Sequence, residues 1–96
     1  MFTHVVFFKL NDVTEGNVRK VASILEAIRG KIFEVKQIEV GIDLLHTDRS
    51  YDLSLITKFN SKEDMDAYQV HPYHVNEVLK YIKPMIKASV VVDYLE

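Results

Sequence analysis

The sequence contains no cysteine, and this absence excludes several classes of function at once. None of its 96 residues is Cys. The chain therefore cannot form disulfides, thiolate zinc sites or iron–sulfur clusters, and it cannot use a cysteine nucleophile. A cysteine-free chain also suits a reducing compartment.

The sequence also has little net charge and no long apolar run. Its 12 Lys and Arg residues against 14 Asp and Glu residues give a net charge of −2. This charge supplies no attraction to phosphate backbones or anionic lipid, so we expect neither a nucleic-acid partner nor a membrane partner. The longest apolar run is residues 5–8, whereas a membrane span needs about 20 residues. With no secretory pattern at the N-terminus, we expect a cytoplasmic protein.

Glycine and proline are scarce and scattered, which predicts one domain over residues 1–96. Only three Gly and two Pro occur, and we find no linker, repeat or low-complexity segment. The hydrophobic fraction of 48% and the charged fraction of 27% are ordinary for a folded chain. Two domains of this combined length would each be too small to bury a core easily.

The spacing of apolar residues predicts four strands and two helical regions. Alternation and β-rich composition indicate strands at residues 3–10, 35–42, 51–59 and 87–95. Residues 15–29 carry apolar side chains at helical spacing, and Gly30 is a suitable helix end. Asn60 followed by Glu63 resembles a capping box that starts the second helical region.

The second helical region contains a break at His71 and Pro72. The residue before a proline avoids the α conformation, whereas proline itself suits the first position of a new helix. We expect this new helix to place an apolar stripe against the core, formed by Val75, Val78, Leu79 and Ile82.

The order β-α-β-β-α-β predicts an α+β, ferredoxin-like fold with a four-stranded antiparallel sheet. Its helices can cover only one face of the sheet. The first and last strands are nevertheless apolar on both faces. We therefore expect an obligate homodimer, packed sheet to sheet about a two-fold axis. The alternative is a monomer whose Val and Phe residues reflect strand propensity alone.

Three segments resemble the stress-responsive A/B-barrel (Dabb) family over nearly the whole chain. They are Thr3-His4-Val5-Val6-Phe7-Phe8-Lys9-Leu10, the central Tyr68…His71-Pro72-Tyr73-His74-Val75, and Val90-Val91-Val92-Asp93-Tyr94. The resemblance implies a ferredoxin-like fold that dimerises into an α+β barrel. Haem-degrading relatives of this barrel shape usually carry a pocket tryptophan, which this chain lacks.

The active-site motif is similar to that of one plant branch of the family, the olivetolic acid cyclases. Those enzymes cyclise a linear polyketide by an intramolecular aldol condensation. The resemblance implies that His74 is the catalytic histidine, that Tyr68 is its partner and that His4 is a pocket residue. Leu53 stands where the cyclases carry a further pocket histidine.

The residues themselves are compatible with acid–base chemistry or with ligand binding. His74 falls in the first turn after Pro72, where the helix dipole disfavours an imidazolium. A neutral imidazole suits a general base, and a Tyr68 hydroxyl could donate a hydrogen bond to an enolate oxygen. His4, on an apolar strand face, could line the same interior.

Each of these residues also has a structural interpretation. His71, the third candidate ligand-binding residue beside His4 and Leu53, could instead satisfy backbone groups at a helix start. His4 and His74 could be hydrogen-bonded core histidines, and Tyr68 a core aromatic. Tyr73 fits a surface or dimer-edge position.

We predict no metal and no cofactor. His71 and His74 are three residues apart, but Pro72 removes His71 from a regular helix. No phosphate-binding glycine loop and no serine nucleophile motif occur. Residues 43–50, with His46 and Arg49, fit a mobile cavity rim.

Three functions remain open at this point. The first is a stress-linked homodimer that binds a small, mostly apolar, oxygen-bearing ligand without catalysis. The second is a cyclase-like lyase with His74 as general base and Tyr68 as hydrogen-bond donor. The third is a cofactor-free monooxygenase acting on a phenolic substrate. The enzyme hypotheses require His74 and Tyr68 to point into one cavity, and side chains that diverge would exclude them.

Overall fold

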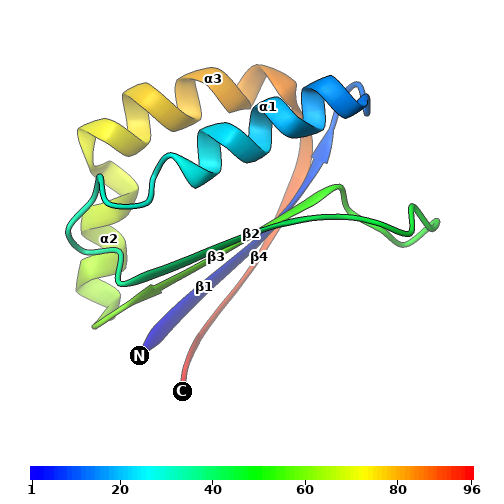
Figure 1. Cartoon of the computed structure of the whole chain (residues 1–96). Helices are drawn as coiled ribbons and strands as arrows, with labels where there is room; N and C mark the ends of the chain where they lie inside the picture. The colour runs from blue at the N-terminus through cyan, green and yellow to red at the C-terminus, as the bar shows by residue number, and fades with distance from the viewer.

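The computed structural model describes residues 1–96 and has helices on one face of a four-stranded antiparallel sheet (Figure 1). Four strands, three α-helical segments, one π-helix (η1) and one 3₁₀-helix (η2) follow one another along the chain. Their bounds are β1 Phe2–Leu10, α1 Glu15–Glu26, β2 Gln37–Ile42, β3 Leu53–Phe59, α2 Lys62–Val70, η1 His74–Leu79, α3 Lys80–Ile82, η2 Lys83–Met85 and β4 Ile86–Leu95.

The strand order is β2-β3-β1-β4, with every neighbouring pair antiparallel. This topology confirms the predicted ferredoxin-like α+β fold. The register places His4 of β1 between Thr57 of β3 and Asp93 of β4. Because side chains alternate along a strand, His4, Val6 and Phe8 all face the helices.

The core lies between this face of the sheet and the helices. In Figure 1, α1 and α3 lie over the sheet, and α2 stands at one end of it. Helix α1 contributes an apolar stripe in which Val21 and Leu25 have no exposed surface. Thr14 caps the helix by accepting from the backbone N–H of Asn17 at 3.1 Å. The helix ends at Glu26, before the predicted end at residue 29, and turns follow it.

The start of α2 differs from the prediction by one residue. Ser61, not Asn60, is the cap, and its hydroxyl accepts from the backbone N–H of Asp64 at 3.2 Å. Ser61 has the extended backbone of a capping residue, with φ −155° and ψ 167°. The predicted box of Asn60 with Glu63 is therefore wrong, although the helix itself forms.

The break at His71 is present, but the segment after it is not a regular α-helix. His71 has ψ 136°, and residues 72–73 return to helical geometry. A six-residue π-helix follows as η1. The wider π turn changes which residues face the sheet. Thus His74 and Val78 are buried, whereas Val75 is 42% exposed, contrary to the predicted stripe.

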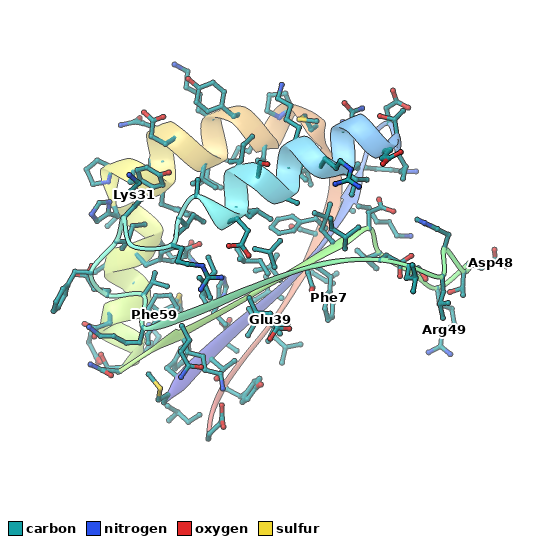
Figure 2. All side chains as sticks on the ribbon, in the orientation of Figure 1. Phe7, Lys31, Glu39, Asp48, Arg49 and Phe59 are labelled. Carbon is teal, nitrogen blue, oxygen red and sulfur yellow. The ribbon has the colours of Figure 1, made fainter.

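The outer face of the sheet has no helices. Phe7 points away from the helical layer in Figure 2, and the tip of the β2–β3 connection, with Asp48 and Arg49, extends past the end of the sheet. Val90 and Val92 of β4 lie beside Phe7 and Val5 on this outer face, and both valines are exposed. No helix in the molecule is both long enough and apolar enough to cross a membrane.

Candidate binding site in the cavity between sheet and helices

A cavity of about 210 Å³ lies between the helix-facing side of the sheet and the segment from α2 to α3. Nine of its 13 lining residues are hydrophobic. His4 reaches it from β1, Tyr68 from α2 and His74 from η1. The structure thus brings together three of the site residues predicted from the sequence. A mainly apolar cavity with a few convergent polar groups is the usual form of a small-molecule site.

His74 contributes a free hydrogen-bond acceptor to this cavity. Its Nδ1 lies 3.1 Å from the carbonyl oxygen of Gln69. Because a carbonyl oxygen only accepts, Nδ1 carries the proton and Nε2 carries the lone pair. Nε2 makes no hydrogen bond within the chain. Every side-chain nitrogen or oxygen that is fully buried does have a hydrogen-bond partner, so Nε2 is not fully buried. The Nε2 atom is therefore accessible, and His74 is one of the residues that line the cavity.

The surroundings of His74 keep its ring neutral. Burial lowers the pKa of His74 below its ordinary value, while the hydrogen bond to Gln69 acts in the opposite direction. Positive charge on His4, His71 and Lys83 would lower this pKa further. The sequence predicted a neutral ring from the helix dipole, but desolvation is the largest cause.

Tyr68 contributes a hydroxyl donor next to His74. Its ring centroid lies 4.4 Å from that of His74 and 5.2 Å from that of Phe59. Tyr68 is only 1% exposed, and its hydroxyl has no partner within the chain. The same reasoning as for His74 therefore leaves this hydroxyl accessible, and Tyr68 lines the same cavity as His74. Burial raises the pKa of Tyr68, so the hydroxyl stays protonated and can donate.

His4 is held by a partner that the sequence analysis did not single out. Its Nδ1 lies 2.5 Å from Oδ1 of Asp93, directly opposite it in the β1–β4 register. A carboxylate accepts, so this contact orients the His4 ring and leaves Nε2 as its second polar atom. The available signal was an acidic residue within the apolar strand around Val91 and Val92. Only the register shows that it faces His4.

Two other predicted ligand-binding residues do not line this cavity. His71 is turned to the backbone, because its Nδ1 accepts from the N–H of Tyr73 at 3.0 Å. Leu53 is 2% exposed and borders a different cavity of about 300 Å³, together with Phe7 and Arg49. The absence of the cyclase histidine at Leu53 therefore leaves the set of His4, Tyr68 and His74 intact.

The remaining polar candidates are held in local contacts. Tyr73 is half-buried and donates through its hydroxyl to the carbonyl of Ala27 at 3.1 Å, so it ties this region to the end of α1. His46 lies 3.4 Å from Asp43 within the β2–β3 connection. No three His, Asp or Glu side chains come together in a geometry that could hold a metal ion.

Sequence comparison relates the chain to one domain family. The family model described as "Stress responsive A/B Barrel Domain" (Dabb) matches residues 2–96. Two stress-response A/B barrel domain-containing proteins of Arabidopsis thaliana are similar over 96% of this chain, one (DABB1) at 32% identity and the other at 25%. The chain spans 45% of the length of the first protein and 35% of that of the second.

Solved structures agree with this relationship. A dimeric ferredoxin-like protein of unknown function from Thermobifida fusca has 30% identity and a TM-score of 0.86, and 99% of this chain aligns with 90% of that chain. A dimeric protein from Bacteroides fragilis has 28% identity and a TM-score of 0.82, with coverage of 99% and 95%. The hydroxynitrile lyase of Passiflora edulis shares the fold at 18% identity and a TM-score of 0.80, with coverage of 99% and 92%.

Proposed function

Since the chain belongs to the stress-responsive A/B barrel domain (Dabb) family, we propose that it is a homodimer that binds a small, mostly apolar, oxygen-bearing molecule in the cavity of each subunit. The observation that carries the binding proposal is the pair of free polar groups in a mainly apolar cavity. Tyr68 offers an O–H donor, and His74, whose ring centroid lies 4.4 Å from that of Tyr68, offers an Nε2 acceptor in the same cavity. One hydroxyl oxygen of a ligand can satisfy both groups, while its hydrocarbon body contacts the apolar walls. The cysteine-free composition supports a cytoplasmic location.

The dimer proposal is supported by the outer face of the sheet and by the relatives. Phe7, Val90 and Val92 expose apolar surface on that face, and a second copy would remove it from water. The similar proteins from Thermobifida fusca and Bacteroides fragilis are both described as dimeric. We propose sheet-to-sheet packing about a two-fold axis, which leaves the cavity on the opposite side of the sheet accessible to ligand.

Binding can be tested with 4-propylphenol by calorimetry or NMR titration. The phenol O–H can donate to His74, and its oxygen can accept from Tyr68. Tyr68→Phe removes only the hydroxyl and should weaken binding about tenfold, the equivalent of one good hydrogen bond. Tyr81→Phe is the matched control, because Tyr81 is exposed and lies outside the cavity lining. The methyl ether 4-propylanisole cannot donate and should bind more weakly than the phenol.

Two results would reject the binding proposal. One is equal affinity of the wild type and Tyr68→Phe for 4-propylphenol. The other is an equal loss of affinity in Tyr81→Phe, because an effect at an exposed tyrosine cannot come from the cavity.

A second candidate function is acid–base catalysis, favoured by the neutral His74 ring with its free Nε2. In this reaction Nε2 takes a proton from the carbon next to a ligand carbonyl. The electron pair of the C–H bond moves to form an enolate, whose oxygen accepts from the Tyr68 hydroxyl. This is the first step of a cyclase-like or lyase-type reaction.

Deuterium exchange separates catalysis from binding. The ketone 4-phenyl-2-butanone in heavy water should exchange its α-protons faster with the protein than without it, as followed by NMR. His74→Ala should reduce this exchange by a factor on the order of 10² or more. If 4-propylphenol binds and the ketone gains no exchange, the protein is a binding protein without this acid–base step.

A further inference from the structure

At the break between α2 and η1, the side chains of His71 and His74 both form hydrogen bonds with the backbone. In an uninterrupted α-helix, the N–H of Tyr73 would donate to the carbonyl of Gln69, four residues earlier. Here the Tyr73 N–H donates instead to Nδ1 of His71 at 3.0 Å. The Gln69 carbonyl accepts from Nδ1 of His74 at 3.1 Å. His71 thus binds the amide that would otherwise compete for the acceptor of His74.

The local backbone makes this arrangement possible. His71 has φ −60° and ψ 136°, the extended conformation of a helix N-cap. Tyr73 is the second helical residue after it, which is the amide that an N-cap side chain normally binds. Pro72 has no N–H, so it cannot compete for the carbonyls at the end of α2. The Tyr73 amide is consequently the donor that a continuous α-helix would offer to the Gln69 carbonyl.

We infer that His71 is a positioning residue that sets the tautomer of His74: by capping the Tyr73 amide, it reserves the Gln69 carbonyl for His74 and so leaves Nε2 of His74 unprotonated toward the cavity. This inference deepens the proposed function, and its relevance to binding rests on that proposal. It also gives a role to His71, which lies outside the cavity lining. In the His-Pro-Tyr-His segment, the first histidine accepts from a backbone amide, and the second lines the cavity.

The wild-type protein provides the first test, by ¹⁵N NMR of the histidine rings without ligand. His71 must be unprotonated at Nδ1, because that atom accepts, whereas His74 must be protonated at Nδ1, because that atom donates. The two rings are therefore expected in opposite tautomers at a pH where both are neutral. Equal tautomers in the folded wild type would overturn the inference.

Substitution of His71 provides the second test. His71→Gly removes the acceptor but keeps a residue that is well tolerated at an N-cap. It should cause loss of the single His74 tautomer, with the Nε2-protonated form becoming populated. His71→Asn restores an oxygen acceptor for the Tyr73 amide and should restore the wild-type tautomer. A single Nδ1-protonated His74 in folded His71→Gly would overturn the inference.

A matched control separates this effect from a general change in histidine environment. His46 has φ 52° in the β2–β3 connection, and asparagine tolerates that conformation. His46→Asn should leave the His74 signals unchanged. All these measurements use protein without ligand, so failure of 4-propylphenol to bind would reject the proposed function without affecting this result. A tautomer unchanged by His71→Gly would reject the role of His71 while leaving binding possible.

Discussion

The two faces of the sheet differ most clearly at Phe7 and Phe8, which are adjacent in β1. Phe8 faces the helices and is 8% exposed, whereas Phe7 faces outward and is 39% exposed. On the helix-covered face, the helices of this one chain bury Phe8. On the outer face, the same strand leaves a large aromatic side chain in water. A strand that is apolar on both faces therefore indicates that both faces are covered. The helices of the same subunit cover one face, and we propose that a second subunit covers the other.

The cavity lies where the helix-covered face becomes incomplete. Val6 of β1 is 7% exposed, but its neighbour Val91 in β4, on the same face, is 49% exposed. Both residues line the cavity. The helices thus cover the centre of the sheet more fully than β4, and the space left beside β4 is where we propose that the ligand binds. Packing among the rings of Phe59, Tyr68 and His74 positions the two polar side chains and leaves the cavity open.

Truncation of the two phenylalanines should give the largest contrast. Phe8→Ala should lower the free energy of unfolding by about 3–5 kcal/mol through loss of core packing. Phe7→Ala should instead raise the dimer dissociation constant about tenfold or more, through loss of apolar burial between subunits. Urea denaturation and analytical ultracentrifugation at two protein concentrations distinguish the effects. A Phe7→Ala variant with unchanged subunit dissociation would contradict the role of the outer face.

A charge on the outer face should break the dimer and, because we expect the dimer to be obligate, lower the stability of the fold. Val92→Lys places an ammonium group where we propose that the second copy packs, and an unpaired buried charge is costly. Light scattering should change from twice 11.1 kDa toward 11.1 kDa, and the separated subunit should unfold at a lower urea concentration than the wild-type dimer. Val70→Lys is the matched control, because Val70 is also exposed but ends α2. If Val92→Lys and Val70→Lys have the same mass in solution, the outer face of the sheet is not the dimer interface.

The smallest expected effect is a pH dependence from the helix-covered face. The pKa of His74 is lowered in the folded chain, so on acidification the unfolded chain binds this proton first. The stabilisation from His74 is therefore present above its unfolded pKa of about 6.5 and is lost as pH falls toward its lower folded pKa. His74→Asn should lose less unfolding free energy than the wild type between about pH 8 and about pH 5.

The control for this pH dependence is His46→Asn, which changes an exposed histidine. Its slope of unfolding free energy against pH, measured by urea denaturation at fixed protein concentration, gives the effect of losing a histidine outside the cavity. A steeper slope in His74→Asn than in the wild type would reverse the sign expected from burial.

Much of the fold could be predicted because it depends on local regularities. Alternation in the strands, helical spacing before Gly30 and the Pro72 break are all visible in the sequence, and all are present in the structure. The errors occurred where local signals compete. Asn60 and Ser61 are both capping residues, and backbone geometry chose Ser61. The π-helix, which exposes Val75, has no composition signal of its own.

The candidate site also has features that the sequence predicted and features that only the structure revealed. The resemblance to the family motif identified Tyr68, His74 and His4, and their residue types were compatible with acid–base chemistry or ligand binding. The partner of His4 was missed, because Asp93 is 89 residues away along the chain and meets it only through the β1–β4 register. The sequence left His71 open between a backbone contact and a ligand contact, and the structure shows the backbone contact.

Composition, periodicity and the position of proline were enough for the class of fold and the order of its elements, because both depend on residues close together in the chain. The three polar side chains of the site were identified through the resemblance to the family motif. Tertiary packing decided which ring nitrogens are free, which carboxylate meets His4 and where the cavity remains open. These features depend on contacts between distant segments, and such contacts exist only once the sheet has its register and the helices lie on it.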